Sequence, residues 1–204
     1  MIDPAILKPA QEFSAAVSAL VASVANAVVS VAAAGGRGSG FAWRPGYIVT
    51  AEEALAEDAE VHVTFADGKT LPARVVGRDP TTDIALLQVE RSNIATVPVA
   101  DTPPQAGAVA VAVGAEQGVA VAALGLVAHV GGRWRSMRGG DIDQRIELDI
   151  ALRRSGEGGV VVDTSGRQLG MVVFGPRRRA LVIPSATIER TAEQLRLHGR
   201  IARG

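Results

Sequence analysis

The sequence predicts an all-β protein with a helix at each end, and two observations support this. Short apolar runs, separated by turn signals about every 8–12 residues, follow one another from Gly40 to Ser185, as in a β-barrel or β-sandwich. In the two terminal segments, apolar residues recur at helical spacing instead. The 204 residues are 48% hydrophobic, with mean hydropathy +0.22. This is enough for one large or two small cores, and it excludes a disordered chain.

The first segment is uncharged over residues 14–34, 21 positions in all, which is long enough for a membrane span. Alanine and serine dominate it, however, so insertion would be weak, and the acidic start MIDPAILK does not suit a signal peptide. Apolar residues recur along one helical face at Phe13, Val17, Leu20, Val21 and Val24. We therefore expect an amphipathic helix over residues 1–26, followed by a short strand, and no membrane association.

The central strands divide into two groups of similar size. A Pro-Gly turn at Pro45 and a hairpin at Asp67-Gly68 mark the first group, and the proline-rich segment 100–107 is the best internal linker. We place the first group in residues 27–105 and the second in 106–185. The last helix, 186–204, has Ile188, Ala192 and Leu195 on one face and stops at Gly199.

Composition excludes several kinds of function. The formal net charge is zero, and an excess of about four acids in residues 1–100 is matched by an equal excess of bases afterwards, too mild for a nucleic-acid partner. The chain has no cysteine, which excludes disulfides, thiol nucleophiles and Cys-zinc sites. Its histidines, His62, His129 and His198, are far apart in sequence. We expect neither a His-rich metal site nor a cofactor.

Four segments follow one another in the order found in one known family. The chain contains GRGSGFAWRPGYIVTAEEAL, then VVGRDPTTDIALLQV, then DIALRRSGEGGVVVDTSGRQLG, and finally VIPSATIERTAEQLRLHGRIARG. Together they resemble the trypsin-like serine proteases of the HtrA type, from about Ala27 to Gly204. The resemblance implies two six-stranded barrels of the trypsin type, 27–105 and 106–185, with the former active site in the cleft between them.

The catalytic triad that the resemblance implies is degenerate. Counting from Thr50 in the family's Thr-x-x-His motif, the general base is replaced by Glu53, while Asp83 matches the triad aspartate. The nucleophile position, in the loop that the family writes Gly-Asn-Ser-Gly-Gly-Pro, is Glu157. A carboxylate has no hydroxyl to attack a carbonyl. Losing the nucleophile and the base together costs on the order of 10⁶ in turnover, so an inactive protease homologue is implied.

The loop around Glu157 departs from the family in other ways. Its oxyanion loop comprises Ser155, Gly156, Gly158 and Gly159. The resemblance implies that the amides of residues 155 and 157 form the oxyanion hole, which an ionised Glu157 would repel or fill. Ser155 stands in place of a glycine, and Val160 in place of a proline. Ser155 is an alternative nucleophile only with a base beside it, so we favour a turn serine.

If the triad positions meet, three carboxylates converge. Two unit charges about 4 Å apart repel by roughly 4 kcal/mol at an effective dielectric of about 20. Relief could come from Glu53 or Glu157 turning to water, which we favour, or from one acid staying protonated. Pairing with Arg153 or Arg154 is another outcome. A Ca²⁺ or Mg²⁺ ion held by Glu53, Asp83 and Glu157 is the last.

A second charged feature is the loop carrying Arg177, Arg178 and Arg179, which lies near the substrate-pocket loops of the resembling family. It could bind an anionic partner, although a solvated loop is the favoured interpretation.

The leading hypothesis is a binding, scaffold or regulatory protein that retains recognition of a protein or peptide partner, by strand addition in the cleft. The alternatives are an endopeptidase with residual or unusual activity and a divalent-cation site in the former active site. Many family members carry a PDZ domain and form trimers, so the first helix could serve homo-oligomerisation or pack on its own barrel. The family is mostly periplasmic or envelope-located, but no signal peptide is recognisable, so a cytoplasmic location stays open.

Overall fold

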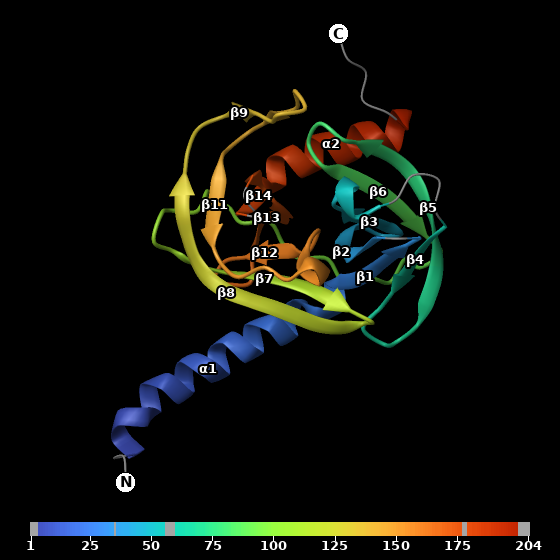
Figure 1. Cartoon of the computed structure of the whole chain (residues 1–204). Helices are drawn as coiled ribbons and strands as arrows, with labels where there is room; N and C mark the ends of the chain where they lie inside the picture. The colour runs from blue at the N-terminus through green and yellow to red at the C-terminus, as the bar shows by residue number, and fades with distance from the viewer. Residues whose placement is uncertain (1–3, 35, 56–59, 177–178, 200–204) are drawn as a thin grey trace.

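The computed structural model describes residues 4–34, 36–55, 60–176 and 179–199, and these form two closed barrels of six strands each. The barrels lie side by side, one helix crosses the end of both, and the other projects away from them (Figure 1). The helices are α1 (Pro4–Val24) and α2 (Ser185–His198). The strands are β1 (Val28–Ala33), β2 (Gly36–Arg44), β3 (Tyr47–Thr50), β4 (Val61–Thr64), β5 (Thr70–Asp79), β6 (Ile84–Val89), β7 (Val109–Glu116), β8 (Val119–Val130), β9 (Trp134–Arg135), β10 (Asp141–Ile142), β11 (Ile146–Asp149), β12 (Val160–Val162), β13 (Gln168–Phe174) and β14 (Ala180–Pro184).

The first barrel closes in the order β1-β2-β3-β6-β5-β4, with antiparallel neighbours throughout. Its hairpins form where turn residues interrupt the alternating pattern. Gly46 has φ +78° between β2 and β3, and Gly68 has φ +79° between β4 and β5. Left-handed backbone of this kind favours glycine and allows a tight connection. The Asp67-Gly68 hairpin predicted from the sequence is therefore confirmed.

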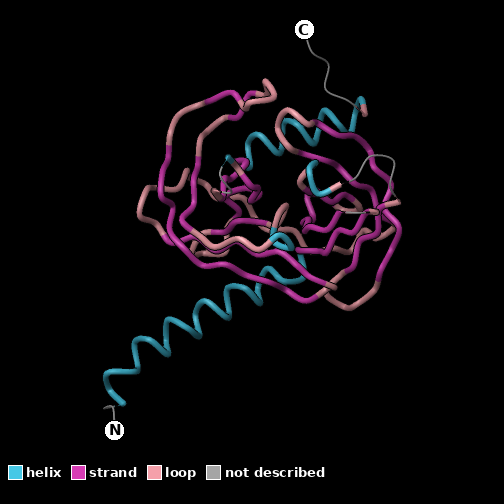
Figure 2. The backbone as a smooth tube through the Cα atoms, viewed as in Figure 1, coloured by secondary structure: helices cyan, strands magenta, loops and turns pink. Residues whose placement is uncertain are grey.

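The second barrel closes in the order β11-β14-β13-β12-β7-β8. A separate two-stranded hairpin, β9–β10, interrupts the connection from β8 to β11. The same view as a tube shows this hairpin rising from the barrel toward the helix that crosses the top (Figure 2). The hairpin was not expected from the sequence.

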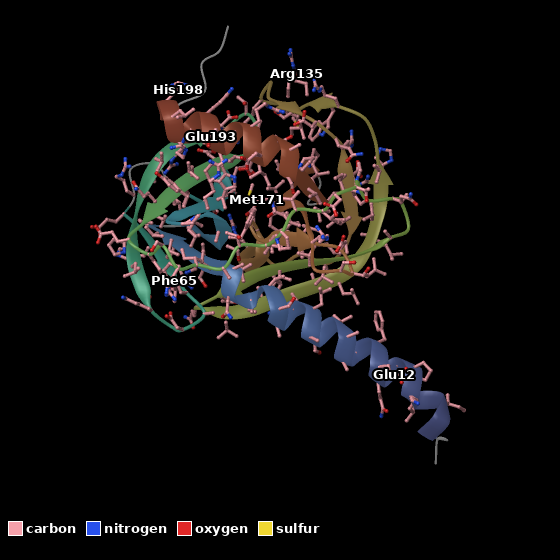
Figure 3. The ribbon with its side chains drawn as sticks, turned by 180° about the vertical axis from the view of Figure 1, so that it is seen from behind. Glu12, Phe65, Arg135, Met171, Glu193 and His198 are labelled. Atoms are coloured by element: carbon pink, nitrogen blue, oxygen red, sulfur yellow. The ribbon has the colours of Figure 1, made fainter. Side chains whose placement is uncertain are left out.

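Apolar burial holds the two barrels together. One cluster fills the first barrel, including Val29, Ile48 and Leu87, and another fills the second. A third and larger cluster draws on both barrels and on α2. Met171 belongs to this third cluster, and Figure 3 shows it at the centre of the molecule. Burying this apolar surface is the main force that sets the barrels against each other, and so fixes the cleft between them.

Helix α2 covers the junction through the face predicted from its sequence. Ile188, Ala192 and Leu195 are almost fully buried. The helix ends at Gly199, whose φ of +67° closes a left-handed cap with its amide bonded to the carbonyl of Leu195 at 2.8 Å. The Arg44 guanidinium adds an ion pair to Glu193 at 2.8 Å.

Helix α1 packs on the barrels only through its last turns. Leu20, Val21 and Val24 reach the core cluster, whereas Phe13 is 53% exposed. Figures 1 and 3 show the helix projecting from the body, with Glu12 toward its free end. The alternative in which the whole apolar stripe packs on its own barrel is therefore wrong. Among the described helices, none combines the length and apolarity that crossing a membrane requires.

Candidate functional site

The structure brings the three predicted triad positions together. Glu53 lies in a short turn after β3, Asp83 directly precedes β6, and Glu157 lies in the loop before β12. Each offers a carboxylate oxygen, and these oxygens all lie within 4.8 Å of one another. Of the side chains that the structure describes, these are the ones grouped closely enough to ligate a metal ion together. The three residues that the motif spacing predicts for one site therefore lie side by side.

Asp83 fastens the turn that carries Glu53. Its carboxylate accepts a hydrogen bond from the Glu53 amide at 2.9 Å, and its carbonyl accepts one from the Glu52 amide at 3.3 Å. Asp83 has φ +56°, an uncommon conformation for a residue other than glycine. The preceding turn supports it, because the buried Asp79 carboxylate accepts hydrogen bonds from the hydroxyls of Thr81 and Thr82. These hydrogen bonds hold Asp83 in position beside Glu53.

Burial and neighbouring acids change the charge state of Asp83. Burial raises its pKa, the hydrogen bond from the Glu53 amide lowers it, and repulsion from Glu53, Glu157 and Glu52 raises it again; the net result is a pKa of about 7. Asp83 therefore holds a proton over much of the acidic and near-neutral range. One of the alternatives considered from the sequence was that one of the three acids stays protonated, and this pKa favours that alternative for Asp83.

Glu157 points into the protein and not to water. The residue is 6% exposed, and its carboxylate accepts a long hydrogen bond, 3.4 Å, from the Phe174 amide at the end of β13. The favoured expectation was that Glu53 or Glu157 turns to water; Glu157 does not, whereas the Glu53 side chain is 46% exposed. The following Gly158 has φ +82°, and a Cβ there would lie 2.3 Å from the Ser39 carbonyl. Only glycine lets the loop pass this close to the first barrel.

Four amides of the glycine loop, those of residues 156 to 159, donate hydrogen bonds to backbone carbonyls of the protein. The amides of Gly156 and Glu157 bond to the carbonyls of Arg153 and Arg154, at 2.9 and 3.2 Å. Those of Gly158 and Gly159 bond to other backbone carbonyls at 2.8 and 3.0 Å. An oxyanion hole needs amides aimed at the developing negative charge. The predicted contribution of the residue 157 amide is therefore wrong, because a turn within the loop uses that amide.

Glu53 is paired with an arginine that the sequence did not indicate. Arg138, in the loop between β9 and β10, lies 2.8 Å from the Glu53 carboxylate and 3.7 Å from that of Glu52. Both partners are about half exposed. From the sequence, Arg153 or Arg154 was expected to pair with one of the three acids. The ion pair that the structure describes on Glu53 is made by Arg138 instead. The β9–β10 hairpin thus reaches across from the second barrel to the first.

Ser39 is a further residue that sequence reasoning missed. Its amide donates to the Glu157 carbonyl at 2.7 Å, and its hydroxyl accepts a hydrogen bond from the Ala115 amide at 2.8 Å. The hydroxyl also contacts the Ser155 carbonyl. Ser39 is fully buried, and it links β2, β7 and the glycine loop. Its place between two glycines in the GSG motif was the available signal.

A cavity of about 570 Å³ opens beside the triad positions. Both barrels line it, the first through Pro80 to Asp83 and the second through Val173 to Pro176. The loop around Met137 and Arg138 also contributes to its wall. Its volume falls within the range of roughly 300–1,000 Å³ that is typical of ligand sites.

Two of the other predicted residues, Ser155 and Arg179, have surroundings of their own. Ser155 lies in the short turn Arg154–Gly156, and the favoured interpretation as a turn serine agrees with that placement. Arg179 pairs with Glu147 at 3.0 Å, so it is not an unpaired cation for an anionic partner. Arg177 and Arg178 lie outside the described residues.

Comparison with known proteins places this geometry in one family. The model of the trypsin-like peptidase domain matches residues 38–171. The chain belongs to the trypsin-like peptidase family. Probable periplasmic serine endoproteases described as DegP-like are 32% identical over 178 residues in Brucella suis and 29% over 177 residues in Chlamydia pneumoniae. Each alignment covers 82% of this chain, which spans about a third of the length of these relatives.

Solved structures of trypsin-like relatives share the fold. The crystal structure of Deg5 has a TM-score of 0.80 and 26% identity, covering 93% of this chain and 98% of its own. The Rv3671c protease of M. tuberculosis H37Rv, in an inactive form, has a TM-score of 0.75 and 22% identity, covering 95% and 96%. The double barrel with terminal helices is thus the fold of HtrA-type trypsin-like domains.

Proposed function

We propose that this trypsin-like chain is proteolytically inactive and acts by binding an extended peptide segment in the cleft between its barrels. One observation supports the proposal: Glu53 and Glu157, which the motif spacing assigns to the general-base and nucleophile positions, hold their carboxylates within 4.8 Å of each other and of the Asp83 carboxylate. Without a hydroxyl and a base there is no group to form and resolve an acyl intermediate.

Two further features support binding without cleavage. The Glu157 amide is used within its own turn, so it contributes nothing to stabilising an oxyanion. The cavity beside the triad positions has mostly apolar walls, including Trp134, Ile142 and Leu181. Apolar pockets with a few polar groups are typical of small-molecule sites, and the same lining suits the apolar side chains of a peptide.

Binding is tested with fluorescein-labelled unfolded casein, followed by anisotropy. We expect a saturable rise that weakens at least several-fold in Phe174→Ala, because Phe174 lines the cavity. The matched control is Val99→Ala, since Val99 is 54% exposed and is not among the residues lining the cavity. Absence of binding, or equal losses in both variants, would contradict the proposal.

An endopeptidase with unusual activity is the competing function, and Ser155 is its candidate nucleophile. A fluorophosphonate probe labels activated serines. We expect no adduct on the wild-type chain, because the described histidines all lie outside the group of side chains at the triad positions. An adduct that maps to Ser155 would favour the enzyme.

A divalent-cation site is the second candidate function, favoured by three carboxylate oxygens within 4.8 Å. The Arg138 pair and the raised pKa of Asp83 oppose it, because both already relieve the repulsion. Isothermal titration calorimetry with millimolar Ca²⁺, Mg²⁺ and Mn²⁺ tests whether the three carboxylates bind a cation. A heat of binding in the wild type that disappears in Glu157→Gln would support a cation site. No heat of binding in the wild type would exclude one.

A further inference from the structure

The cavity between the barrels has apolar walls and an acidic end. Its apolar side chains come from the second barrel and the β9–β10 hairpin. They include Trp134, Ile142, Val173 and Leu181. Glu53 and Asp83 also line the cavity, and the Glu157 carboxylate lies beside theirs; this group of carboxylates forms its acidic end. A ligand that fills this cavity meets an apolar surface and a concentration of carboxylates together.

The chain already places a cation at this acidic end. The guanidinium of Arg138 lies 2.8 Å from Glu53 and 3.7 Å from Glu52. Arg138 comes from the opposite barrel, at the tip of a hairpin that also donates the Ser136 hydroxyl to the Thr81 carbonyl. The geometry of the carboxylates is therefore suited to a guanidinium that approaches from the cavity.

The ion pair of Arg138 is open to exchange. Its side chain is 52% exposed and that of Glu53 is 46% exposed, and exposed pairs of this kind contribute little to stability. The adjacent Met137 is 93% exposed. The tip of the hairpin thus carries an apolar residue next to an arginine, and it resembles a short ligand supplied by the chain itself.

We propose that the cleft selects peptide segments in which an arginine follows apolar residues, the guanidinium replacing Arg138 on Glu53 while the apolar side chains fill the cavity. The proposal rests on the proposed peptide-binding function and specifies its ligand. Charge complementarity selects the arginine, and apolar burial supplies most of the affinity. The hairpin tip then acts as an internal competitor for the same carboxylates.

The test uses two labelled hexapeptides, Ala-Leu-Leu-Arg-Ala-Ala and the same sequence with glutamine in place of arginine, titrated by anisotropy at about pH 8, where Asp83 is ionised. We expect the arginine peptide to bind about 10-fold more tightly. In Glu53→Gln this preference disappears. In Arg138→Ala the arginine peptide binds several-fold more tightly, because its competitor is gone. The matched control is Arg135→Ala, on the same hairpin but paired with Asp141.

The outcomes distinguish arginine selectivity from peptide binding as such. If both peptides bind equally, or if Arg138→Ala and Arg135→Ala behave alike, the arginine selectivity is refuted while peptide binding stands. If neither peptide binds to the wild type or to Arg138→Ala, and casein does not bind either, both proposals are refuted. Circular dichroism of each variant shows that the barrels are folded before the titration.

Discussion

The raised pKa of Asp83 makes protein stability depend on pH in an unusual direction. The folded-state pKa is about 7 and the usual value is 3.8, with burial as the first cause and the neighbouring acids as further ones. Between these values the folded chain holds a proton that the unfolded chain has lost. The free energy of unfolding therefore falls as pH rises through this window. At 1.36 kcal/mol for each pKa unit, the whole change is about 4 kcal/mol.

The perturbation is Asp83→Asn, which keeps the shape of the side chain and an oxygen for the Glu53 amide but removes the titration. We expect the variant to gain up to about 4 kcal/mol over the wild type between about pH 4 and pH 8. The measurement is urea unfolding at several pH values, each chain followed by tryptophan fluorescence. Subtracting the wild-type profile cancels the titration of every other group.

The matched control is Asp143→Asn. Burial raises the pKa of Asp143, but hydrogen bonds from Thr187 and Arg190 outweigh burial and hold that pKa below its usual value. Its ionised form stabilises the fold at neutral pH, and that contribution is lost as pH falls, so the control variant is weakened at neutral pH. Parallel pH profiles for Asp83→Asn and the wild type would refute the reasoning, because they would mean that Asp83 is ionised at low pH like an exposed carboxylate.

Three further predictions concern the framework of the site. Gly158→Ala should lower the free energy of unfolding strongly, because the new Cβ would lie 2.3 Å from a carbonyl oxygen. Its control is Gly68→Ala, where φ is similarly positive but the space is open, and which should lose only about 1–2 kcal/mol. Equal losses in urea unfolding would contradict the close approach at Gly158. Ser39→Ala should cost about 1–3 kcal/mol, because the Ala115 amide loses its buried acceptor; a neutral result would show that this link is dispensable. Phe13→Ser should change the free energy of unfolding of the monomer by less than about 0.5 kcal/mol, because Phe13 is exposed. Leu195→Ala, at a buried position, should cost about 2–5 kcal/mol. A large, concentration-dependent effect of Phe13→Ser, checked by light scattering, would indicate that α1 forms an interface between chains.

Much of the fold follows from local sequence signals. Turn residues such as Gly68 mark the hairpins, because few other residues adopt positive φ, and the apolar face of α2 is visible from the spacing of Ile188 and Leu195. The direction of α1 is not visible in this way. Its apolar stripe indicates a helix with one apolar face, but the stripe cannot show that only its last turns meet the barrels.

The site was located from the sequence, but its chemistry was not. Motif spacing predicts that Glu53, Asp83 and Glu157 lie together, as they do in the structure, because short loops join them to their strands. The Arg138 pair depends on a hairpin about 85 residues further along the chain, and no local pattern links the two. The orientation of the loop amides around Glu157 is also a tertiary property, set by hydrogen bonds within the turn and to neighbouring strands.

The central claim is that carboxylates have replaced the catalytic groups of a trypsin-like protease. Its most direct measurement is the digestion of casein by the wild type and by Glu157→Ala, each repurified to constant specific activity and analysed by mass spectrometry. We expect no cleavage above the buffer control in either sample. Cleavage by the wild type that survives repurification and is lost in Glu157→Ala would show that the chain is an endopeptidase, and the account would be wrong.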